Sequence, residues 1–329
     1  MRELMPGGGS HQAGMFCSII IPTIGRDTLT RAVESALTQE FWAGEFEVIV
    51  VNDSGKPLPD AQWQRSPNVR LIHTMRRERS VARNAGAALA KGKYFCFLDD
   101  DDWLLPGALE AIWAVARDAR NAAWLYGGIR IVDESGNVLG EMNSGLQGNR
   151  SAQVTGGAWV PLQSSFILGE SFFQAGGFNP AILVTQDLDL CRRITLYGEL
   201  ANTPMTIACL FRGRTWRSST DYRLATEFTR WSRDAILSQP GAFRRLLSSA
   251  DESYWRGRML HLYLSSIIYN LRRRSLSTAM SRSLYGLVTL GFSVRHLLSR
   301  SFWQAVRADH VPETLHFVMQ AQEVGSVAS

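Results

Sequence analysis

The sequence predicts an α/β protein with a mostly parallel sheet flanked by helices and a helical C-terminal extension. Three observations lead to this prediction. Short, almost entirely apolar runs alternate with helix-like segments from about residue 16 to residue 132. Strands of that composition belong to parallel sheets that are covered on both faces. After about residue 217 the alternation stops, and helical patterns with basic faces take its place.

The individual elements follow from local signals. We expect strands at residues 16–21, 46–51, 69–73, 94–98 and 124–132. Asp27 is suited to cap a helix whose apolar face includes Leu29 and Val33. An alanine-rich helix should cover residues 79–90 and close near Gly92, and another should begin at Pro106. The polar segment 140–157 predicts a mobile loop, and residues 169–175 and 186–197 predict two helices.

Composition limits the class of protein. The 329 residues are 45% hydrophobic and 20% charged, which excludes a disordered or fibrous chain. We expect a flexible tail over residues 1–15, an α/β domain over 16–217 and a basic helical region over 218–329. No run of about 18 apolar residues occurs, so no membrane-spanning helix is expected. Four widely spaced cysteines indicate reduced thiols and a cytoplasmic protein.

The charges are unevenly distributed along the chain. Residues 1–200 contain 18 basic and 22 acidic side chains, whereas residues 201–329 contain 17 basic and 8 acidic ones. A basic C-terminal region favours an anionic partner, such as phosphate or anionic lipid. Nucleic acid is not expected, because no nucleic-acid motif accompanies the basic residues and the acidic residues 99–102 would repel its backbone.

Polar residues follow the predicted strands at the positions where parallel sheets bind ligands, beyond the strands' carboxyl ends. Pro22 and Thr23 follow the first strand, Asp53 follows the second, and residues 99–102 follow the fourth. Neither a GxGxxG nor a GxxxxGK[ST] motif is present, so the dinucleotide-binding and P-loop classes are not favoured.

The strongest signal is the run of four aspartates at residues 99–102. Adjacent carboxylates repel one another unless a cation or solvent neutralises them. Hard oxygen ligands directly after a buried strand suit Mg²⁺ or Mn²⁺, and such an ion would share its coordination with a diphosphate. The alternative interpretation is a solvated acidic turn.

A second signal is Asp187, which heads a predicted helix. Its spacing places it on one face with Leu190, Cys191 and Ile194. A carboxylate on an inward face is costly unless it has a partner or a function. The alternative is an acidic residue that is favoured at the N-terminus by the helix dipole.

Five segments, in this order, resemble glycosyltransferase family 2, whose members have the GT-A fold. They are SIIIPTIGR, EVIVVNDSG, SVARNAGAALAKGKYFCFLDDDDWLLPGAL, GGFNP and QDLDLCRRI, and they span about residues 17–195. The long third segment is the most specific of them. The resemblance implies a nucleotide-sugar donor, a divalent metal ion and inversion at the anomeric carbon.

The resemblance also implies roles for matching residues. Asp187 would be the catalytic base, and Asp99 and Asp101 would bind the metal. Asp53 would accept a hydrogen bond from the nucleotide base. The remaining nucleotide-sugar contacts would come from Pro22, Thr23, Arg83, Asn84, Asp99 and Asp100, with Arg83 alternatively bracing the aspartates. Contacts to the acceptor or diphosphate would come from Gln186, Arg193 and Arg214, the last at a position where many relatives have histidine.

The function expected from these features is inverting transfer from a UDP-, GDP- or dTDP-sugar, with Mn²⁺ or Mg²⁺, to a glycan or glycolipid in bacterial polysaccharide or glycoconjugate biosynthesis. One alternative is an inactive GT-A protein that binds carbohydrate or acts as a scaffold. Another is a sugar nucleotidyltransferase, but residues 22–27 are too short and carry too little positive charge for its phosphate loop. An apolar stripe ending at residues 272–274, all arginine, suits peripheral contact with the inner face of the cell membrane. The alternative is that the stripe packs against the catalytic domain or a second subunit, with the arginines in solvent.

Overall fold

The structure is a computed structural model that describes residues 14–75, 78–120, 122–213, 222–248, 252–272, 274–290 and 294–307. The described strands form one mixed sheet. They are β1 (Met15–Thr23), β2 (Glu45–Asn52), β3 (Val69–His73), β4 (Tyr94–Phe97), β5 (Trp103–Leu104), β6 (Ala122–Asp133), β7 (Val138–Met142), β8 (Ser165–Leu168) and β9 (Glu199–Arg212). Their order in the sheet is β3-β2-β1-β4-β8-β6-β9-β5, and β7 pairs with β6.

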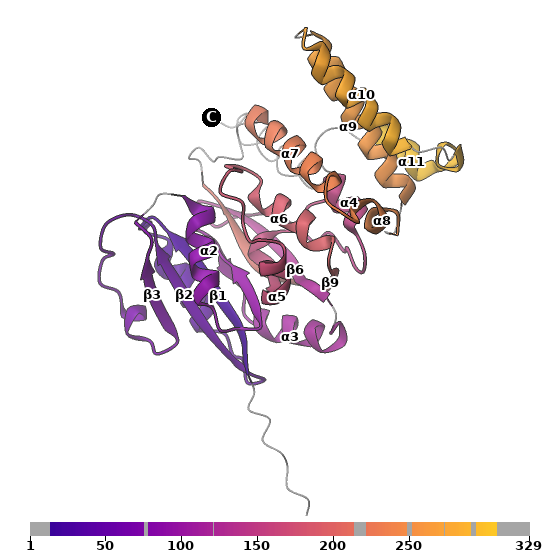
Figure 1. Ribbon diagram of the computed structural model, residues 1–329. Coiled ribbons are helices and arrows are strands. Elements are labelled where there is room, and N and C mark those ends of the chain that lie inside the picture. Colours follow the sequence, from indigo (N-terminus) through magenta and orange to yellow (C-terminus); the bar gives the residue numbers. More distant parts are fainter. Residues whose placement is uncertain are drawn as a thin grey trace, which may run out of the picture.

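Helices cover this sheet, and a further group of helices follows it. The first group comprises α1 (Leu29–Leu37), α2 (Arg79–Leu89), α3 (Ala108–Asp118), α4 (Ser151–Thr155), α5 (Gly169–Gln174) and α6 (Gln186–Thr195). The second comprises α7 (Tyr222–Leu237), α8 (Ala242–Leu247), α9 (Glu252–Arg272), α10 (Leu276–Leu290) and α11 (Arg300–Arg307). Figure 1 shows the second group to one side of the sheet, with α4 next to it, and other helices of the first group around the sheet. The predicted α/β class is therefore confirmed.

The parallel half of the sheet comes from the first strands of the chain. β1 pairs in parallel with both β2 and β4, and β2 pairs in parallel with β3. β8 runs antiparallel to β4 and β6, whereas β6 and β9 are parallel. Because β1, β2 and β4 run in the same direction, the residues that follow them lie at one edge of the sheet.

Alternation along β1 explains why the sheet is covered on both faces. Ile19 and Ile21 belong to the core on the side of α1, while Ile20 belongs to the core on the side of α2. Successive side chains of a strand point to opposite faces, so a strand that is apolar throughout requires helices on both sides. All three isoleucines are fully buried.

A polar network secures the amino ends of the strands. Ser18 Oγ donates to Glu47 Oε1 at 2.8 Å, and the Lys91 N–H donates to the same oxygen at 2.7 Å. Arg70 forms an ion pair with Glu47 Oε2. Burial raises the pKa of Glu47, but these hydrogen bonds and the charge of Arg70 outweigh burial, so the pKa lies below its ordinary value. Glu47 therefore links β1, β2, β3 and the segment before β4.

Gly92 has a different role from the expected helix cap. The helix α2 ends at Leu89, and Gly92 has no left-handed backbone conformation. A Cβ atom at this position would lie 2.3 Å from the backbone carbon of Cys17. Glycine is needed here because the chain passes against β1 and not because it ends a helix.

Two other expectations about local structure are wrong. Asp27 does not cap α1, since the cap residue is Thr28 and no side chain bonds the cap. The segment 140–157 is not simply a mobile loop, because it contains the end of β7 and the whole of α4. The strands β5, β7, β8 and β9 are additional to the five expected strands. Residues 1–13 of the expected tail 1–15 lie outside the described residues, and Met15 is the first residue of β1.

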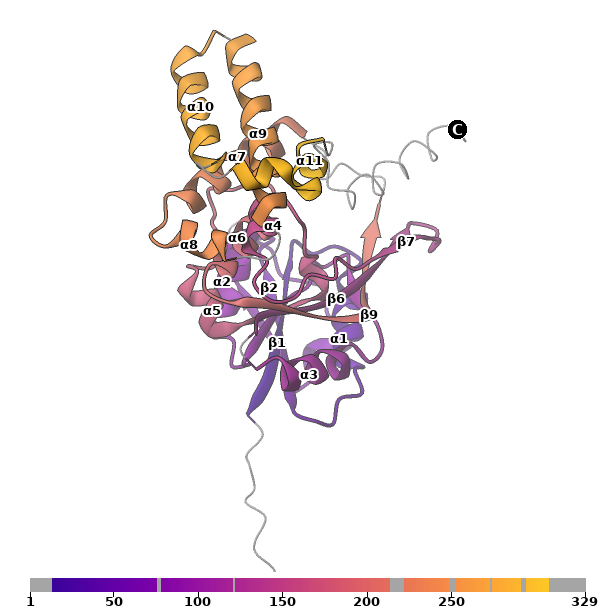
Figure 2. The ribbon, with the colours of Figure 1, turned by 90° about the vertical axis from the view of Figure 1, so that its right-hand side faces the viewer.

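Helices follow the sheet after about residue 217, as expected, within the residues that the structure describes. In both views α9 and α10 extend beyond the remaining helices, away from the sheet (Figures 1 and 2). No helix of the described residues is both long enough and apolar enough to span a lipid bilayer.

Candidate active site

The candidate site lies at the carboxyl ends of β1, β2 and β4. Thr23 pairs with Asn52 at the ends of β1 and β2, and the Asp53 N–H donates to the Thr23 carbonyl at 2.8 Å. The four aspartates begin two residues after β4, which pairs with β1 on its other side. Three segments that are distant in sequence therefore meet at one edge of the sheet, as predicted.

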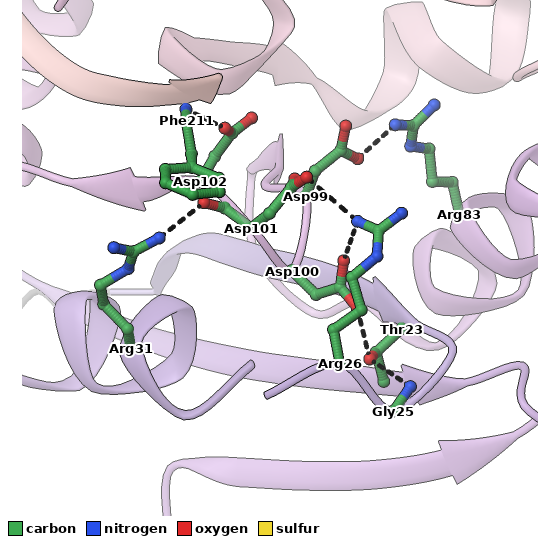
Figure 3. Close-up of polar contacts among 10 residues, drawn as sticks. All are labelled: Thr23, Gly25, Arg26, Arg31, Arg83, Asp99, Asp100, Asp101, Asp102 and Phe211. Carbon is green, nitrogen blue, oxygen red and sulfur yellow. Dashed lines mark hydrogen bonds and ion pairs between the residues drawn. The ribbon is translucent and has the colours of Figure 1, made fainter. Parts of the chain in front are cut away.

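The four aspartate side chains point in different directions, as Figure 3 shows. Asp100 is buried and turns toward β1. Its Oδ2 accepts a hydrogen bond from Thr23 Oγ1 at 2.6 Å, and its Oδ1 accepts one from Arg26 Nη1 at 2.8 Å. Asp100 therefore connects the aspartate turn to the segment after β1.

Asp99 turns the other way, toward α2. Its Oδ1 accepts a hydrogen bond from Arg83 Nη2 at 2.5 Å. The Arg83 side chain is only 4% exposed, whereas that of Asp99 is 31% exposed. The guanidinium group is thus a buried support behind a carboxylate that still reaches solvent, which is the bracing role considered for Arg83.

Asp101 and Asp102 continue the turn. Arg26 Nη1 lies 3.1 Å from Asp101 Oδ2, and Arg31 Nη2 donates to the Asp101 carbonyl at 3.0 Å. Asp102 is buried, and its Oδ1 accepts the Phe211 N–H at 2.8 Å. The last of these bonds attaches the end of β9 to the aspartate turn (Figure 3).

Three of these carboxylates have the arrangement of a metal site. Oxygen atoms of Asp99, Asp101 and Asp102 all lie within 4.8 Å of one another. Carboxylate oxygens are the ligands that Mg²⁺ and Mn²⁺ prefer, and a site with few protein ligands leaves positions for diphosphate oxygens and water. The residues therefore fit a divalent cation, with Asp102 beside the expected pair Asp99 and Asp101.

The electrostatic setting differs between neighbouring aspartates. Burial would raise the pKa of Asp99, but the positive charges of Arg83, Arg79 and Arg26 outweigh burial and hold that pKa below its ordinary value. Burial raises the pKa of Asp100, despite the hydrogen bond from Thr23 and the charge of Arg26. Asp99 is therefore the stronger candidate for an ionised ligand, and Asp100 for a structural role.

Asp53 is buried and already engaged in the protein. Its Oδ1 accepts from Thr74 Oγ1 and its Oδ2 accepts from the Glu78 N–H, both at 2.6 Å. The carboxylate thus fixes the chain between β3 and α2 beside the site. A carboxylate oxygen can accept more than one hydrogen bond, so these contacts do not exclude one from a nucleotide base. The contact with the base stays a prediction.

Asn84 holds a distant loop next to the aspartate turn. Its Nδ2 donates to the Phe178 carbonyl at 2.8 Å, and its Oδ1 accepts the Phe178 N–H at 2.9 Å. Gly177 has a φ of +68°, and a Cβ there would lie 2.8 Å from Asn84 Oδ1. Both amide atoms of Asn84 therefore bind the backbone of Phe178 and hold this loop beside α2.

Asp187 lies in the first turn of α6, as predicted, and is partly exposed. Its Oδ2 accepts a hydrogen bond from Trp159 Nε1 at 2.9 Å. One carboxylate oxygen is thus oriented by the indole. Gln186 is buried, and its Nε2 donates to the Leu183 carbonyl at 2.6 Å.

Arg193 lies on the same helix and binds protein groups. Its Nε and Nη2 donate to Asp189 Oδ2 at 3.0 and 2.6 Å, and its Nη1 donates to the carbonyls of Ala175 and Gly177 at 2.5 and 2.7 Å. Arg193 thus joins α6 to the loop that Asn84 also holds. Arg214 lies outside the described residues.

Three buried arginines connect α6 and the C-terminal helices to α4. Arg192 Nε, Arg233 Nε and Arg258 Nε donate to the carbonyls of residues 154, 155 and 156, at 3.4, 3.1 and 3.4 Å. These carbonyls lie at the C-terminal end of α4, where positive charge is favoured. Burial lowers the pKa of Arg192 to about 10 and that of Arg233 to about 9. Both values keep the guanidinium groups charged at neutral pH.

Sequence reasoning had assigned no role to Arg26, Arg31 or Trp159. Arg26 follows β1 within the matching segment PTIGR, so its position was a usable signal. Arg31 stacks on Trp103, with its guanidinium carbon 3.8 Å from the ring centroid, and no local pattern marks that contact. Trp159 reaches Asp187 across 28 positions in the sequence, which only the fold can show.

Comparison with known proteins identifies the domain that carries this site. Residues 18–166 match the model of glycosyl transferase family 2. An uncharacterized glycosyltransferase of Rickettsia felis is 30% identical over 54% of this chain and 31% of its own length. The succinoglycan biosynthesis protein ExoO of Rhizobium meliloti is 36% identical over 56% of this chain and 53% of its own.

A solved structure agrees with the fold. The crystal structure of S. aureus TarS 1–349 in complex with UDP-GlcNAc superimposes with a TM-score of 0.59 at 15% identity, covering 82% of this chain and 90% of that one. The present chain spans 31% and 53% of the two relatives named above. The family match, the named relatives and the shared architecture agree with one another, and residues 18–166 therefore belong to glycosyltransferase family 2 and lie within a GT-A fold.

Proposed function

We propose that this protein is an inverting glycosyltransferase that moves a sugar from a nucleoside-diphosphate sugar to a hydroxyl group of a glycan or glycolipid, in bacterial polysaccharide or glycoconjugate biosynthesis. The observation that carries the proposal is the cluster of Asp99, Asp101 and Asp102 at the carboxyl edge of the sheet, within a family 2 domain. The likeness to ExoO, a succinoglycan biosynthesis protein, supports the assignment to polysaccharide synthesis.

The donor site in this proposal is formed by the ends of β1, β2 and β4. Asp99 and Asp101, with Asp102, would hold Mn²⁺ or Mg²⁺, which when bound neutralises the charge that develops on the leaving diphosphate. Arg83 Nη2 binds Asp99 from the buried side and so holds a positive charge behind the place of the diphosphate. Pro22, Thr23 and Asp53 border the place of the nucleotide.

Asp187 is the catalytic base in this proposal. Trp159 occupies its Oδ2, which leaves Oδ1 for the hydroxyl proton of the acceptor. The deprotonated oxygen attacks the anomeric carbon on the side opposite the diphosphate, the bond to the diphosphate breaks, and the configuration inverts. Gln186, Arg193 and Arg214 were expected near the acceptor or diphosphate. The bonds of Gln186 and Arg193 to the protein support an indirect role in which they hold α6 in place.

We place the enzyme in the cytoplasm, at the inner face of the cell membrane. All four cysteines are buried and free, which is typical of a reducing compartment. An inactive carbohydrate-binding protein is the remaining alternative. The supported carboxylates at Asp99 and Asp187 argue against it, since a binding protein has no need of a held base.

Release of UDP from UDP-GlcNAc, with Mn²⁺ and with water as acceptor, tests the proposal. UDP-GlcNAc is the first donor to use because TarS was crystallised with it, and GDP- and dTDP-sugars form the rest of the panel. Asp101→Asn should lose both metal-dependent donor binding and release. Asp187→Asn should keep donor binding and lose release by about 10²–10⁴-fold.

The matched control is Asp118→Asn, an exposed carboxylate at the end of α3 whose loss should leave both readings unchanged. Proton NMR of the released sugar gives the anomeric configuration directly. No release from any donor, together with metal-dependent binding, would favour the inactive carbohydrate-binding protein.

A further inference from the structure

The C-terminal helices α9 and α10 form a hairpin that extends away from the rest of the protein. The rings of Tyr263 and Tyr285 lie with centroids 5.9 Å apart, and Gly286 packs against Tyr263. Figures 1 and 2 show this pair projecting beyond the other helices in two perpendicular views. The inner sides of the two helices are therefore used for packing, and their outer sides are available.

The outer sides carry large apolar residues at helical spacing. Each residue is 45–75% exposed, and within each helix the spacing of three or four residues places them in one stripe. We refer to these residues as the hairpin face. They are Leu264, Ile268 and Leu271 on α9, and Leu276, Met280, Leu284 and Leu287 on α10. Two neighbouring helices that each expose such a stripe are a candidate interaction site.

The charge of this part of the chain is of one sign. Residues 253–308 contain nine arginines and no aspartate or glutamate. Two of the arginines, Arg272 and Arg274, are exposed at the turn between α9 and α10, next to Leu271 and Leu276 of the hairpin face. The tip of the hairpin thus combines apolar side chains with positive charge.

The charge pattern distinguishes two binding partners for the hairpin face, a second copy of this chain and an anionic bilayer. A symmetric dimer through the hairpin would bring the same surface of each copy together, so arginines would face arginines with no carboxylate from this segment to pair with them. An anionic bilayer is complementary to both features. Its headgroups attract the arginines, and the boundary of its acyl chains accepts leucine and methionine side chains.

We propose that the hairpin face, together with Arg272 and Arg274, binds the surface of an anionic lipid bilayer. This inference deepens the proposed function, because an enzyme held at the membrane can act on an acceptor that is carried by a lipid. The hairpin is well placed for that. In both views β1 begins at the end of the sheet distant from the hairpin, so the carboxyl ends of the parallel strands point toward the hairpin side (Figures 1 and 2).

The test uses co-sedimentation of the full chain with vesicles. One set is phosphatidylcholine alone, and the other also contains phosphatidylglycerol. The proposal predicts sedimentation with the anionic vesicles only, weakened by salt. Arg272→Ser with Arg274→Ser should weaken partitioning about 25-fold, since each basic residue near an anionic surface contributes about 5-fold. Leu276→Ser with Met280→Ser should weaken it at both low and high salt.

A matched pair of substitutions separates a specific surface from general attraction. Arg117 and Arg120 are exposed arginines on the α/β domain. Changing both to serine removes the same charge and should leave partitioning nearly unchanged. An equal loss in that variant would overturn the proposal, and so would recovery of the wild type in the supernatant with anionic vesicles at low salt.

Two further readings make the result unambiguous. Light scattering gives the mass in solution, and a dimer that Leu276→Ser with Met280→Ser dissociates, without any vesicle binding, would assign the hairpin face to a second copy. UDP release from UDP-GlcNAc is measured on the same variants without vesicles. If the wild type releases UDP but does not bind vesicles, the membrane proposal alone is refuted. If the wild type releases no UDP, the result counts against the proposed function.

Discussion

Replacing Trp159 by phenylalanine tests whether Asp187 is a positioned base. The substitution keeps an aromatic ring but removes the N–H that donates to Asp187 Oδ2 at 2.9 Å. A hydrogen bond to a charged group contributes about 1.5–3 kcal/mol. If the bond serves to orient the carboxylate for proton transfer, its loss lowers kcat by about 10–150-fold, because each 1.36 kcal/mol corresponds to a factor of ten. The complete loss of a base, about 10²–10⁴-fold, sets the upper limit.

The assay is the initial rate of UDP release from UDP-GlcNAc with Mn²⁺, compared with donor affinity measured by calorimetry. Trp159→Phe should lower kcat and leave donor affinity unchanged. Trp42→Phe is the control, because the Trp42 side chain is 93% exposed and its indole can be changed without effect on the site.

A double-mutant cycle gives the decisive comparison. If Trp159 acts through Asp187, Trp159→Phe should alter the residual rate less than about twofold once Asp187→Asn is present, because the interaction is already lost. If Trp159→Phe lowers the rate by the same factor in the wild type and in Asp187→Asn, the reasoning is refuted. Trp159 would then belong to another step, such as acceptor binding.

Two further predictions concern stability. Glu47→Gln should lower the free energy of unfolding by about 1.5–3 kcal/mol at pH 7, because it removes the ion pair with Arg70. The folded pKa of Glu47 lies below its ordinary value of 4.5, so this contribution is complete above about pH 5 and is lost as the pH falls below that value. Urea unfolding curves of the two proteins should therefore converge in acid, and a difference that persists there would contradict this assignment. Gly92→Ala should cost about 3 kcal/mol or more in thermal or urea unfolding, because the added methyl group meets the Cys17 backbone. Gly14→Ala, where no described residue lies within 4 Å, should be neutral, and similar values for both would exclude close packing as the reason for Gly92.

The parallel strands could be predicted because their signal is local. β1 and β2 are apolar over almost their whole length, and strands buried on both faces need that composition. β9 is not predictable from its sequence, because polar residues and Pro204 interrupt its apolar pattern. The pairing of β9 with β6 is irregular around this proline, which is where a sheet tolerates one.

The short helix α4 could not be predicted for a different reason. Five residues are too few for a helix to be stable through local interactions. Arg192, Arg233 and Arg258 supply the partners for the carbonyls at its end, from positions 38, 78 and 102 residues away. The polar composition of residues 140–157 therefore predicted a mobile loop wrongly, because long-range contacts bury most of α4.

The position of the four aspartates was predictable, but the direction of each side chain was not. Strand-end geometry places the run at the edge of the sheet, whereas the direction of each carboxylate depends on its long-range partner. Thr23 draws Asp100 toward β1, Arg83 holds Asp99 toward α2, and the Phe211 N–H fixes Asp102 beneath β9. Asp99, Asp101 and Asp102 nevertheless keep oxygen atoms within 4.8 Å of one another, so their charges still repel unless a cation lies between them.

These partners also connect the two parts of the candidate site. Two adjacent residues of α2 bind different segments of the site. Arg83 binds the side chain of Asp99, and Asn84 binds the backbone of Phe178. Arg193 binds the preceding carbonyl, that of Gly177, from α6, whose first turn contains Asp187. The metal-binding candidates and the candidate base are therefore joined through a single loop, and the left-handed conformation and close approach at Gly177 make glycine necessary there. Inverting transfer needs the base and the leaving diphosphate on opposite sides of one carbon atom. The hydrogen bonds of Arg83, Asn84 and Arg193 fix the distance between the candidate metal ligands and Asp187, and so support that arrangement.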